Sequence, residues 1–246
     1  MRILPRSHAR HWLVVLLLLW ATLAYLVAPE VWRLVYRVDS ALAAGPRVTR
    51  TADGHPGDPI NIALEGTEEQ VIRAVTSAGW YPADPITLDT SARIVADSVF
   101  RRPDEEAPVS SLYLFGRKED LAFELPVGHS PLQRHHVRLW KWAETHLGRE
   151  VWFGSASFDE RVGLSYTTGE VTHHVRPDVD AERDLIMQGL KRSGWAGEEY
   201  FIDGFHQRSE GRNGGGDLWR TDRRLGVVVL SPPGGSTSTA DPPPAW

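Results

Sequence analysis

The chain of 246 residues contains no cysteine. Without a thiol there can be no disulfide, no thiolate nucleophile and no zinc–thiolate cluster. An excess of basic charge is also missing, because the formal net charge is −5 and the sequence pI is near 6.1. We therefore expect no nucleic-acid partner. Hydrophobic residues make up 41% of the chain, which is enough for the core of one large domain or two small ones.

Charge is absent from a long segment near the N-terminus, residues 12–29, WLVVLLLLWATLAYLVAP. A helix of this length reaches about 27 Å, close to the roughly 30 Å of a bilayer's hydrocarbon core. Arg2, Arg6 and Arg10 precede it in a basic tail over 1–11. The pattern predicts one transmembrane anchor. A cleaved signal peptide is the alternative, but the run is longer than a usual signal core and lacks an A-x-A site.

The predicted anchor separates the short N-terminal tail from the rest of the chain. A short N-terminal tail with three arginines favours the cytoplasmic side for that end, so we expect the C-terminal bulk to be extracytoplasmic. Residues 30–56 are predicted to form a juxtamembrane helix and linker, and residues 57–230 a folded domain. The tail over 231–246, rich in proline, glycine, serine and threonine, is predicted to be disordered.

Hydrophobic periodicity predicts two helices in the domain, at 67–79 and about 177–194, and a further short helix at 91–100. Thr67 and Gln70 have the spacing of a capping box. Predicted strands cover 60–64, 133–140, 151–156, 170–175 and 225–230, with a hairpin that pairs 112–115 with 121–125. This order predicts an α+β fold with a mainly antiparallel sheet and two or three helices on one face.

The tetrapeptide HHVR occurs twice, at 135–138 and 173–176. Alternate side chains of a strand point to opposite faces. In each copy, one histidine therefore shares a face with aliphatic residues and the other shares a face with the arginine. The second kind of face carries His136 and Arg138 in the first copy, and His174 and Arg176 in the second.

Three interpretations of these copies stay open. The arginine forks can bind phosphate, sulfate or carboxylate, as in lipid headgroups or phosphorylated glycans. The histidines can instead bind a metal with aspartate ligands, although the spacing matches no named metal motif and adjacent histidines on a strand point apart. In the structural interpretation, His135 and His173 are core residues and the arginines pair with acidic neighbours such as Glu182 and Asp184. We predict no metal site and no cofactor. The aspartates of the metal interpretation are Asp178, Asp180, Asp217 and Asp222.

The glycine-rich stretch NGGGD at 213–217 bears on the anion interpretation, because consecutive glycines let backbone N–H groups converge on an anion. It lacks the GK[ST] ending of a nucleotide-binding loop. The alternative is a flexible hairpin turn. The polar candidates here are Arg212, Asn213 and Asp217.

A serine hydrolase motif is not complete. The stretch FGSASFD offers Ser155 and Ser157 without the second glycine of G-x-S-x-G. His129 is a single histidine on a predicted loop. Whether the protein is an enzyme stays open at this point.

Several long stretches resemble the LssY C-terminal domain family: LYLFGRKEDLAFELPVG, SPLQRHHVRLW, THHVRPDVDAERD and NGGGDLWRTD. The resemblance covers about residues 57–230. It implies a bacterial, membrane-associated protein from a family whose name comes from a locus linked to type I secretion. Some members are joined to membrane domains of the phosphatidic acid phosphatase superfamily, whereas this chain shows one predicted span and no such segment. The resemblance brings no catalytic residues with it.

Two functions follow as hypotheses. The first is a single-pass protein of the bacterial inner membrane whose domain is an accessory or binding module for an anionic envelope component or a partner protein. The alternative is a phosphoester or glycan hydrolase that uses His136 or His174 as an acid/base or metal ligand. The hydrolase hypothesis requires the two HHVR copies to lie on nearby strands. The candidate anion-binding residues are His136, Arg138, His174, Arg176, Arg212, Asn213 and Asp217.

Overall fold

The computed structural model describes residues 6–27, 41–83, 112–128, 133–167 and 171–234. The chain divides into two compact units, residues 1–45 and residues 46–246. The predicted helix at 91–100 lies outside the described residues, as do residues 30–40 of the juxtamembrane segment and all but the first residues of the predicted C-terminal tail.

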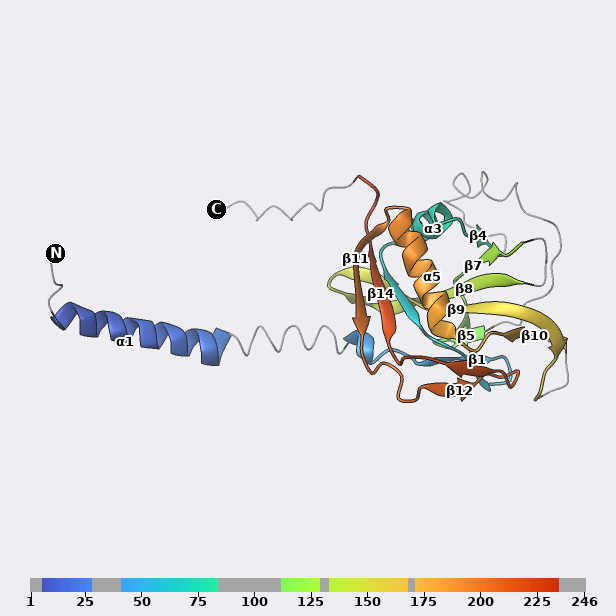
Figure 1. Ribbon diagram of the computed structural model, residues 1–246, viewed down its shortest axis with the longest axis horizontal. Helices are drawn as coiled ribbons and strands as arrows, with labels where there is room; N and C mark the ends of the chain where they lie inside the picture. The colour runs from blue at the N-terminus through green and yellow to red at the C-terminus, as the bar shows by residue number, and fades with distance from the viewer. Residues whose placement is uncertain (1–5, 28–40, 84–111, 129–132, 168–170, 235–246) are drawn as a thin grey trace. The chain divides into compact units, whose positions relative to one another are not determined.

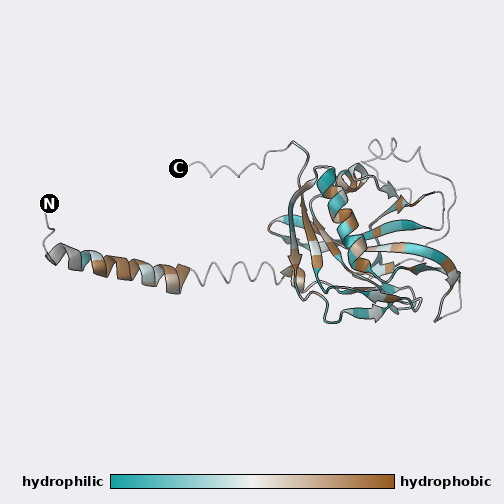
Figure 2. Cartoon of the chain, viewed as in Figure 1, coloured by the Kyte–Doolittle hydropathy of each residue, from teal (hydrophilic) through white to brown (hydrophobic). Residues whose placement is uncertain are grey.

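The first unit contains helix α1 (Arg6–Thr22) and a π-helical turn, η1 (Leu23–Val27). Large apolar side chains are exposed from Trp12 to Val27, and much of the helix is coloured as hydrophobic in Figure 2. Within the described residues, however, no helix combines the length and the apolar character needed to cross a membrane. The predicted span over 12–29 is therefore not found. The α-helix holds 17 residues, and two arginines, Arg6 and Arg10, fall in its first turns.

The second unit is built on an eight-stranded sheet (Figure 1). Seven of its strands follow the order β11-β14-β3-β9-β8-β7-β4, and the eighth, β10, pairs with β9. Every neighbouring pair in it is antiparallel except β14 with β3. The predicted α+β fold with a mainly antiparallel sheet is thus confirmed. The strands are β3 (Ile62–Glu65), β4 (Tyr81–Pro82), β7 (Leu121–Pro126), β8 (Arg134–His146), β9 (Arg149–Leu164), β10 (Val171–Val175), β11 (Ala196–Ile202) and β14 (Leu225–Leu230).

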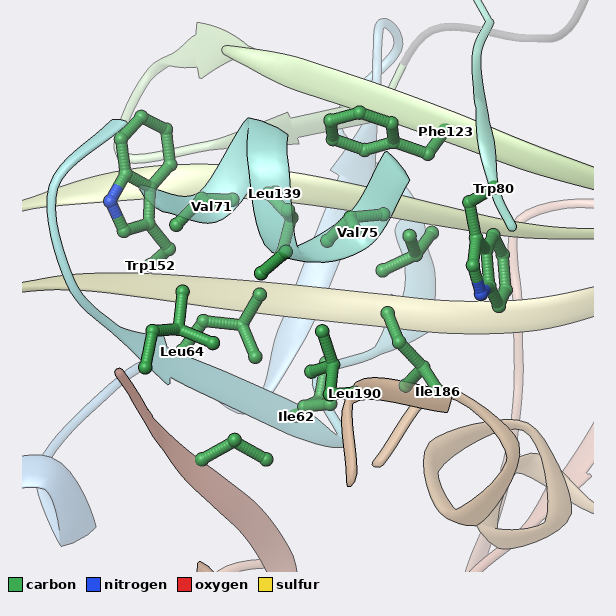
Figure 3. Close-up of a cluster of buried hydrophobic side chains, with 14 of the residues drawn as sticks. Ile62, Leu64, Val71, Val75, Trp80, Phe123, Leu139, Trp152, Ile186 and Leu190 are labelled. Atoms are coloured by element: carbon green, nitrogen blue, oxygen red, sulfur yellow. The ribbon is translucent and has the colours of Figure 1, made fainter. Parts of the chain in front are cut away.

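Helices α3 (Glu68–Ser77) and α5 (Val179–Arg192) pack on one face of this sheet. The capping box that begins α3 is present, with Thr67 and Gln70 bonding reciprocally. Figure 3 shows the apolar side chains of both helices meeting those of the strands. The buried cluster includes Val71 and Val75 from α3, Ile186 and Leu190 from α5, and Ile62, Leu64, Phe123, Leu139 and Trp152 from the sheet.

Smaller elements reach the other face of the large sheet. They form a four-stranded sheet with the order β2-β1-β5-β6 and a hairpin of two further strands. Phe115, beside β5, lies 6.4 Å from Phe153 of β9 between ring centroids. The strands are β1 (Val48–Thr51), β2 (Pro56–Pro59), β5 (Leu112–Leu114), β6 (Arg117–Lys118), β12 (Glu210–Arg212) and β13 (Leu218–Arg220).

Two local predictions are wrong. The predicted hairpin does not form, because β5 pairs with β6 and β1, whereas β7 pairs with β8 in the other sheet. A tight turn at Phe115 and Gly116, both with positive φ, reverses the chain before β7 can meet β5. Residues 46–56, expected to be linker, contain β1 and the start of β2. Strand β11, which pairs with β14, was not predicted at all.

Candidate functional site

The two HHVR copies lie on either side of one strand. Asp159 of β9 is paired with Arg134 of β8 and also with Val175 of β10, so β8 and β10 occupy opposite edges of β9. The copies are therefore close in the sheet, as the hydrolase hypothesis requires.

One face of β8 and β9 carries buried polar side chains where an apolar core is usual. Across the two strands, His136 faces Ser157 and Arg138 faces Ser155. All of these residues are at least nine-tenths buried. Acidic residues from β2, β7 and the turn before β7 complete what we call the interior network. It consists of Asp58, Glu119, Glu124, Arg134, His136, Arg138, Ser155, Ser157 and Asp159.

Asp159 is the central acceptor of the network. Its Oδ2 accepts a hydrogen bond from Nε of Arg134 at 3.2 Å, and its Oδ1 lies 2.9 Å from Nε2 of His136. Arg134 also donates from Nη1 to Oε2 of Glu124 at 3.1 Å. One buried guanidinium group is thus held between two carboxylates, a geometry that stabilises charge away from water.

The protonation of His136 follows from its partners. Nη1 of Arg138 lies 3.2 Å from Nδ1 of His136, and a guanidinium group can only donate. Nδ1 must therefore accept, and Nε2 carries the proton that it donates to Asp159. Oγ of Ser157 lies 3.3 Å from this same Nε2. Because serine and aspartate share one ring nitrogen, the three residues cannot act as a nucleophilic triad, which needs them on opposite nitrogens.

The charges in the network shift two pKa values. Burial alone would raise the pKa of Asp159, but His136, together with His173 and Arg138, holds it well below its usual range. Burial lowers the pKa of His173; Asp159 opposes this shift, while Arg134, His136 and Arg138 add to it. Near pH 7, Asp159 is therefore ionised and His173 is neutral.

The NGGGD loop joins the network from the other side. It connects β12 to β13 as a hairpin, and Oδ1 of Asp217 lies 2.7 Å from Nδ1 of His174. Asn213 accepts from the backbone N–H of Asp217 and donates to Asp58 at 3.0 Å. Asp58 in turn lies 3.9 Å from Arg138. A continuous set of polar contacts therefore runs from the second HHVR copy to the first.

Not every candidate residue takes part. Arg176 is exposed and lies over the ring of Phe158 at 4.3 Å. Strand β10 ends at Val175, so Arg176 lies outside the strand whose alternation was expected to place it beside His174. Arg212 donates to the carbonyl oxygen of Gly216 and so closes the loop. The residues brought together are His136, Arg138, His174, Asn213 and Asp217.

The residues of the structural and metal interpretations can also be located in the fold. His135 lies on the helix side of the sheet, 2.5 Å from Oε2 of Glu182 in α5, so it joins helix and sheet. Asp178 caps α5, while Asp180 and Asp222 pair with Arg183. Among the described residues, no group of three or more histidine, aspartate or glutamate side chains is arranged to hold a metal ion.

The sequence prediction missed part of the network, including Arg134, Asp159, Glu119, Glu124 and Asp58. A signal for Asp159 was present in FGSASFD. There, Ser155, Ser157 and Asp159 recur at every second position of a strand, which indicates a polar face. The acidic partners come from strands distant in the sequence, and no local pattern marked them.

Four polar atoms near the network are buried and have no hydrogen-bond partner among the described residues. They are Nη2 of Arg134, Oγ of Ser155, Oε2 of Glu119 and Nε2 of His173. Each such atom typically costs about 1–3 kcal/mol of stability. Native interiors contain few of them, and those present call for an explanation.

The fold and the network define a class: an α+β domain whose sheet has an apolar face under two helices and a charged, buried face opposite. The family model of the LssY C-terminus matches residues 42–225. The chain belongs to this family, which confirms the resemblance of its motifs. No curated protein and no solved structure matches the chain.

Proposed function

We propose that this protein is a binding module held at the bacterial cell membrane, and that its domain takes a polar component of the cell envelope into the interior network. The four buried, unpartnered atoms beside the network carry this proposal. A ligand that bonds to them would satisfy groups that the described part of the chain leaves unsatisfied.

A purely structural role explains the network poorly. Buried ion pairs contribute little net stability, because desolvation offsets their attraction, and apolar replacements are often as stable. Here the unpartnered Ser155 hydroxyl and the free nitrogen of Arg134 add further cost. Proteins commonly tolerate such costs where a group serves function.

Membrane attachment is proposed from the N-terminal segment. Leu13, Leu17 and Leu18 expose 62%, 63% and 64% of their surface, and so many exposed apolar side chains favour an apolar surrounding. We expect the full-length protein in the membrane fraction after a carbonate wash, and a variant lacking residues 1–40 in the supernatant. A reporter fused after Trp246 would give the side of the membrane, for which we propose the extracytoplasmic side. Recovery of the intact protein in the supernatant would contradict attachment.

One observation favours the alternative, a phosphoester or glycan hydrolase. Asp217 accepts from Nδ1 of His174, which leaves Nε2 as the basic nitrogen, the arrangement that orients many catalytic histidines. His136 has both ring nitrogens engaged and cannot serve this role. If the alternative holds, the purified protein hydrolyses p-nitrophenyl phosphate or p-nitrophenyl glycosides, and His174→Gln removes that activity. The hydrolase alternative would be excluded if the purified protein hydrolysed none of these substrates, or if His174→Gln hydrolysed them as fast as the wild type.

A matched pair of substitutions tests the binding module without knowledge of the ligand. Ser155 and Ser157 are neighbours on the same buried face, but only Ser157 has a hydrogen-bond partner, His136. Ser155→Ala should leave the free energy of unfolding unchanged or raise it, whereas Ser157→Ala should lower it by about 1 kcal/mol. Urea unfolding followed by tryptophan fluorescence measures both.

A clear loss of stability in Ser155→Ala would contradict the proposal. It would mean that the hydroxyl is already satisfied within the protein, and that the network is complete without a ligand.

A further inference from the structure

We propose that the ligand of the interior network is neutral and rich in hydroxyl groups, as a saccharide is, and that it does not bind through a phosphate. This inference rests on the proposed binding function and names its ligand class. It departs from the anion interpretation of the HHVR copies.

The hydrogen-bonding capacity of the four unpartnered atoms favours a ligand rich in hydroxyl groups. Nη2 of Arg134 can only donate a hydrogen bond, Oε2 of Glu119 can only accept one while ionised, and Oγ of Ser155 can do both. The neutral His173 can use Nε2 as donor or acceptor, depending on its tautomer. A hydroxyl group matches each of these atoms, because it both donates and accepts.

Glu119 argues most directly against a phosphate. Its side chain is about nine-tenths buried, its Oε1 lies 4.0 Å from Nε of Arg138, and its Oε2 lacks a donor. The dianion of a phosphate monoester has only acceptor oxygens and a negative charge, so it would repel this carboxylate. A hydroxyl group would instead donate a charge-assisted hydrogen bond to it.

The charges of the described network point the same way. Two guanidinium groups, those of Arg134 and Arg138, face four carboxylate side chains. The carboxylates belong to Asp58, Glu119, Glu124 and Asp159. Sites that bind phosphate usually present an excess of positive groups. In this network, a further anion would meet like charges at short range in a poorly solvated place.

The unpartnered atoms are spread along the network, which favours an extended ligand. Arg134 and Arg138 share one face of β8 and are four positions apart, so their backbones are separated by about 13 Å. The unpartnered atoms belong to residues at both ends of this row: Arg134 at one end, and Ser155 and Glu119 beside Arg138 at the other. A single phosphate would need its donors gathered at one point, whereas a short oligosaccharide can bond along a row.

The test uses the full-length protein in a detergent that has no sugar headgroup. The probes are methyl phosphate, maltotriose and N,N′,N″-triacetylchitotriose. Saturation-transfer difference NMR detects contact, and isothermal titration calorimetry measures affinity. We expect at least one trisaccharide to bind and phosphate not to compete with it.

Glu119→Gln separates the two ligand classes, because it keeps the side chain's shape and removes its charge. For a hydroxyl-rich ligand, the loss of a charge-assisted bond should weaken binding at least fivefold. For phosphate, the loss of a repulsive charge should tighten binding. Glu144→Gln, at an exposed position of β8, is the control and should change neither. Circular dichroism confirms that both variants are folded.

Phosphate binding that tightens in Glu119→Gln would overturn the inference and leave the binding function standing. If no probe binds, the inference is also overturned. A destabilised Ser155→Ala variant would then show that the binding function itself has failed.

Discussion

Arg138 donates to Nδ1 of His136, two positions earlier on the same strand, across 3.2 Å. This contact fixes the tautomer of His136 and directs its Nε2 proton to Asp159. In the second HHVR copy, the equivalent arginine, Arg176, makes no such contact, and its exposed guanidinium group lies over the buried ring of Phe158 instead. Identical tetrapeptides therefore have different roles, because Arg138 lies within β8 whereas Arg176 follows the last residue of β10.

The two arginines should differ in their contribution to stability. Arg138→Ala removes the donor to His136 and the cation beside Asp58 and Glu119, so we expect a loss of about 3–5 kcal/mol in the free energy of unfolding. Arg176→Ala removes a surface contact with an aromatic ring and should cost less than about 1 kcal/mol. Urea unfolding followed by tryptophan fluorescence measures both, and equal losses would refute the assignment.

The charge on Asp159 should make stability depend on pH. Its pKa in the folded protein lies below the unfolded value of about 3.9. The resulting stabilisation is present above that value and is lost as the pH falls through it towards the folded pKa. Asp159→Asn should therefore lower stability at pH 7 and show a smaller further drop between pH 5 and pH 3 than the wild type. Parallel pH curves for the two proteins would count against an ionised Asp159.

Much of the fold could be predicted from local sequence, because the signals were local. The capping box of Thr67 and Gln70, the apolar side of α5 and the strand at 225–230 were each predicted and are present. The pairing of strands was less accessible. Nothing near residues 112–125 indicates that β5 and β7 belong to different sheets, because pairing is decided by partners far along the chain.

The candidate site was only partly predictable for the same reason. The HHVR copies and the NGGGD loop led to residues that are in contact in the fold, such as His174 with Asp217. The balance of charge depends on Glu119 from the turn before β7 and Asp58 from β2, which appeared in the sequence as ordinary acidic residues. The HHVR motif taken alone suggests an anion site. The acidic residues that pair with it in the fold change the expected ligand from an anion to a neutral molecule.

The middle and last glycines of the NGGGD loop should differ in tolerance to substitution. Gly216 has φ +88, and a Cβ there would lie 2.8 Å from Cβ of Tyr166. At Gly215, the nearest atom to an added Cβ would be 3.5 Å away. Gly216→Ala should cost about 1–3 kcal/mol, and Gly215→Ala about 0.5 kcal/mol or less. A tolerant Gly216 would show that the loop does not need this conformation to hold Asp217.

A second buried carboxylate, Glu65, lies outside the network and provides a test of packing at the other end of the sheet. It is fully buried, and its Oε1 accepts from Tyr200 at 2.8 Å and lies 2.7 Å from Nδ1 of His146. Tyr200→Phe removes a donor to a buried charge and should cost about 1.5–3 kcal/mol.

The matched control is Tyr166→Phe. The Tyr166 hydroxyl also bonds to a charged group, Arg161, but its side chain is 66% exposed, so water can replace the lost bond. We expect that variant to unfold within about 0.5 kcal/mol of the wild type. Thermal melts of the two variants distinguish the cases, since a loss of 2 kcal/mol lowers the Tm of a domain of this size by about 4–8 °C. If both tyrosines melt like the wild type, the Glu65 carboxylate does not depend on Tyr200, and its burial must be balanced through His146 and Arg149.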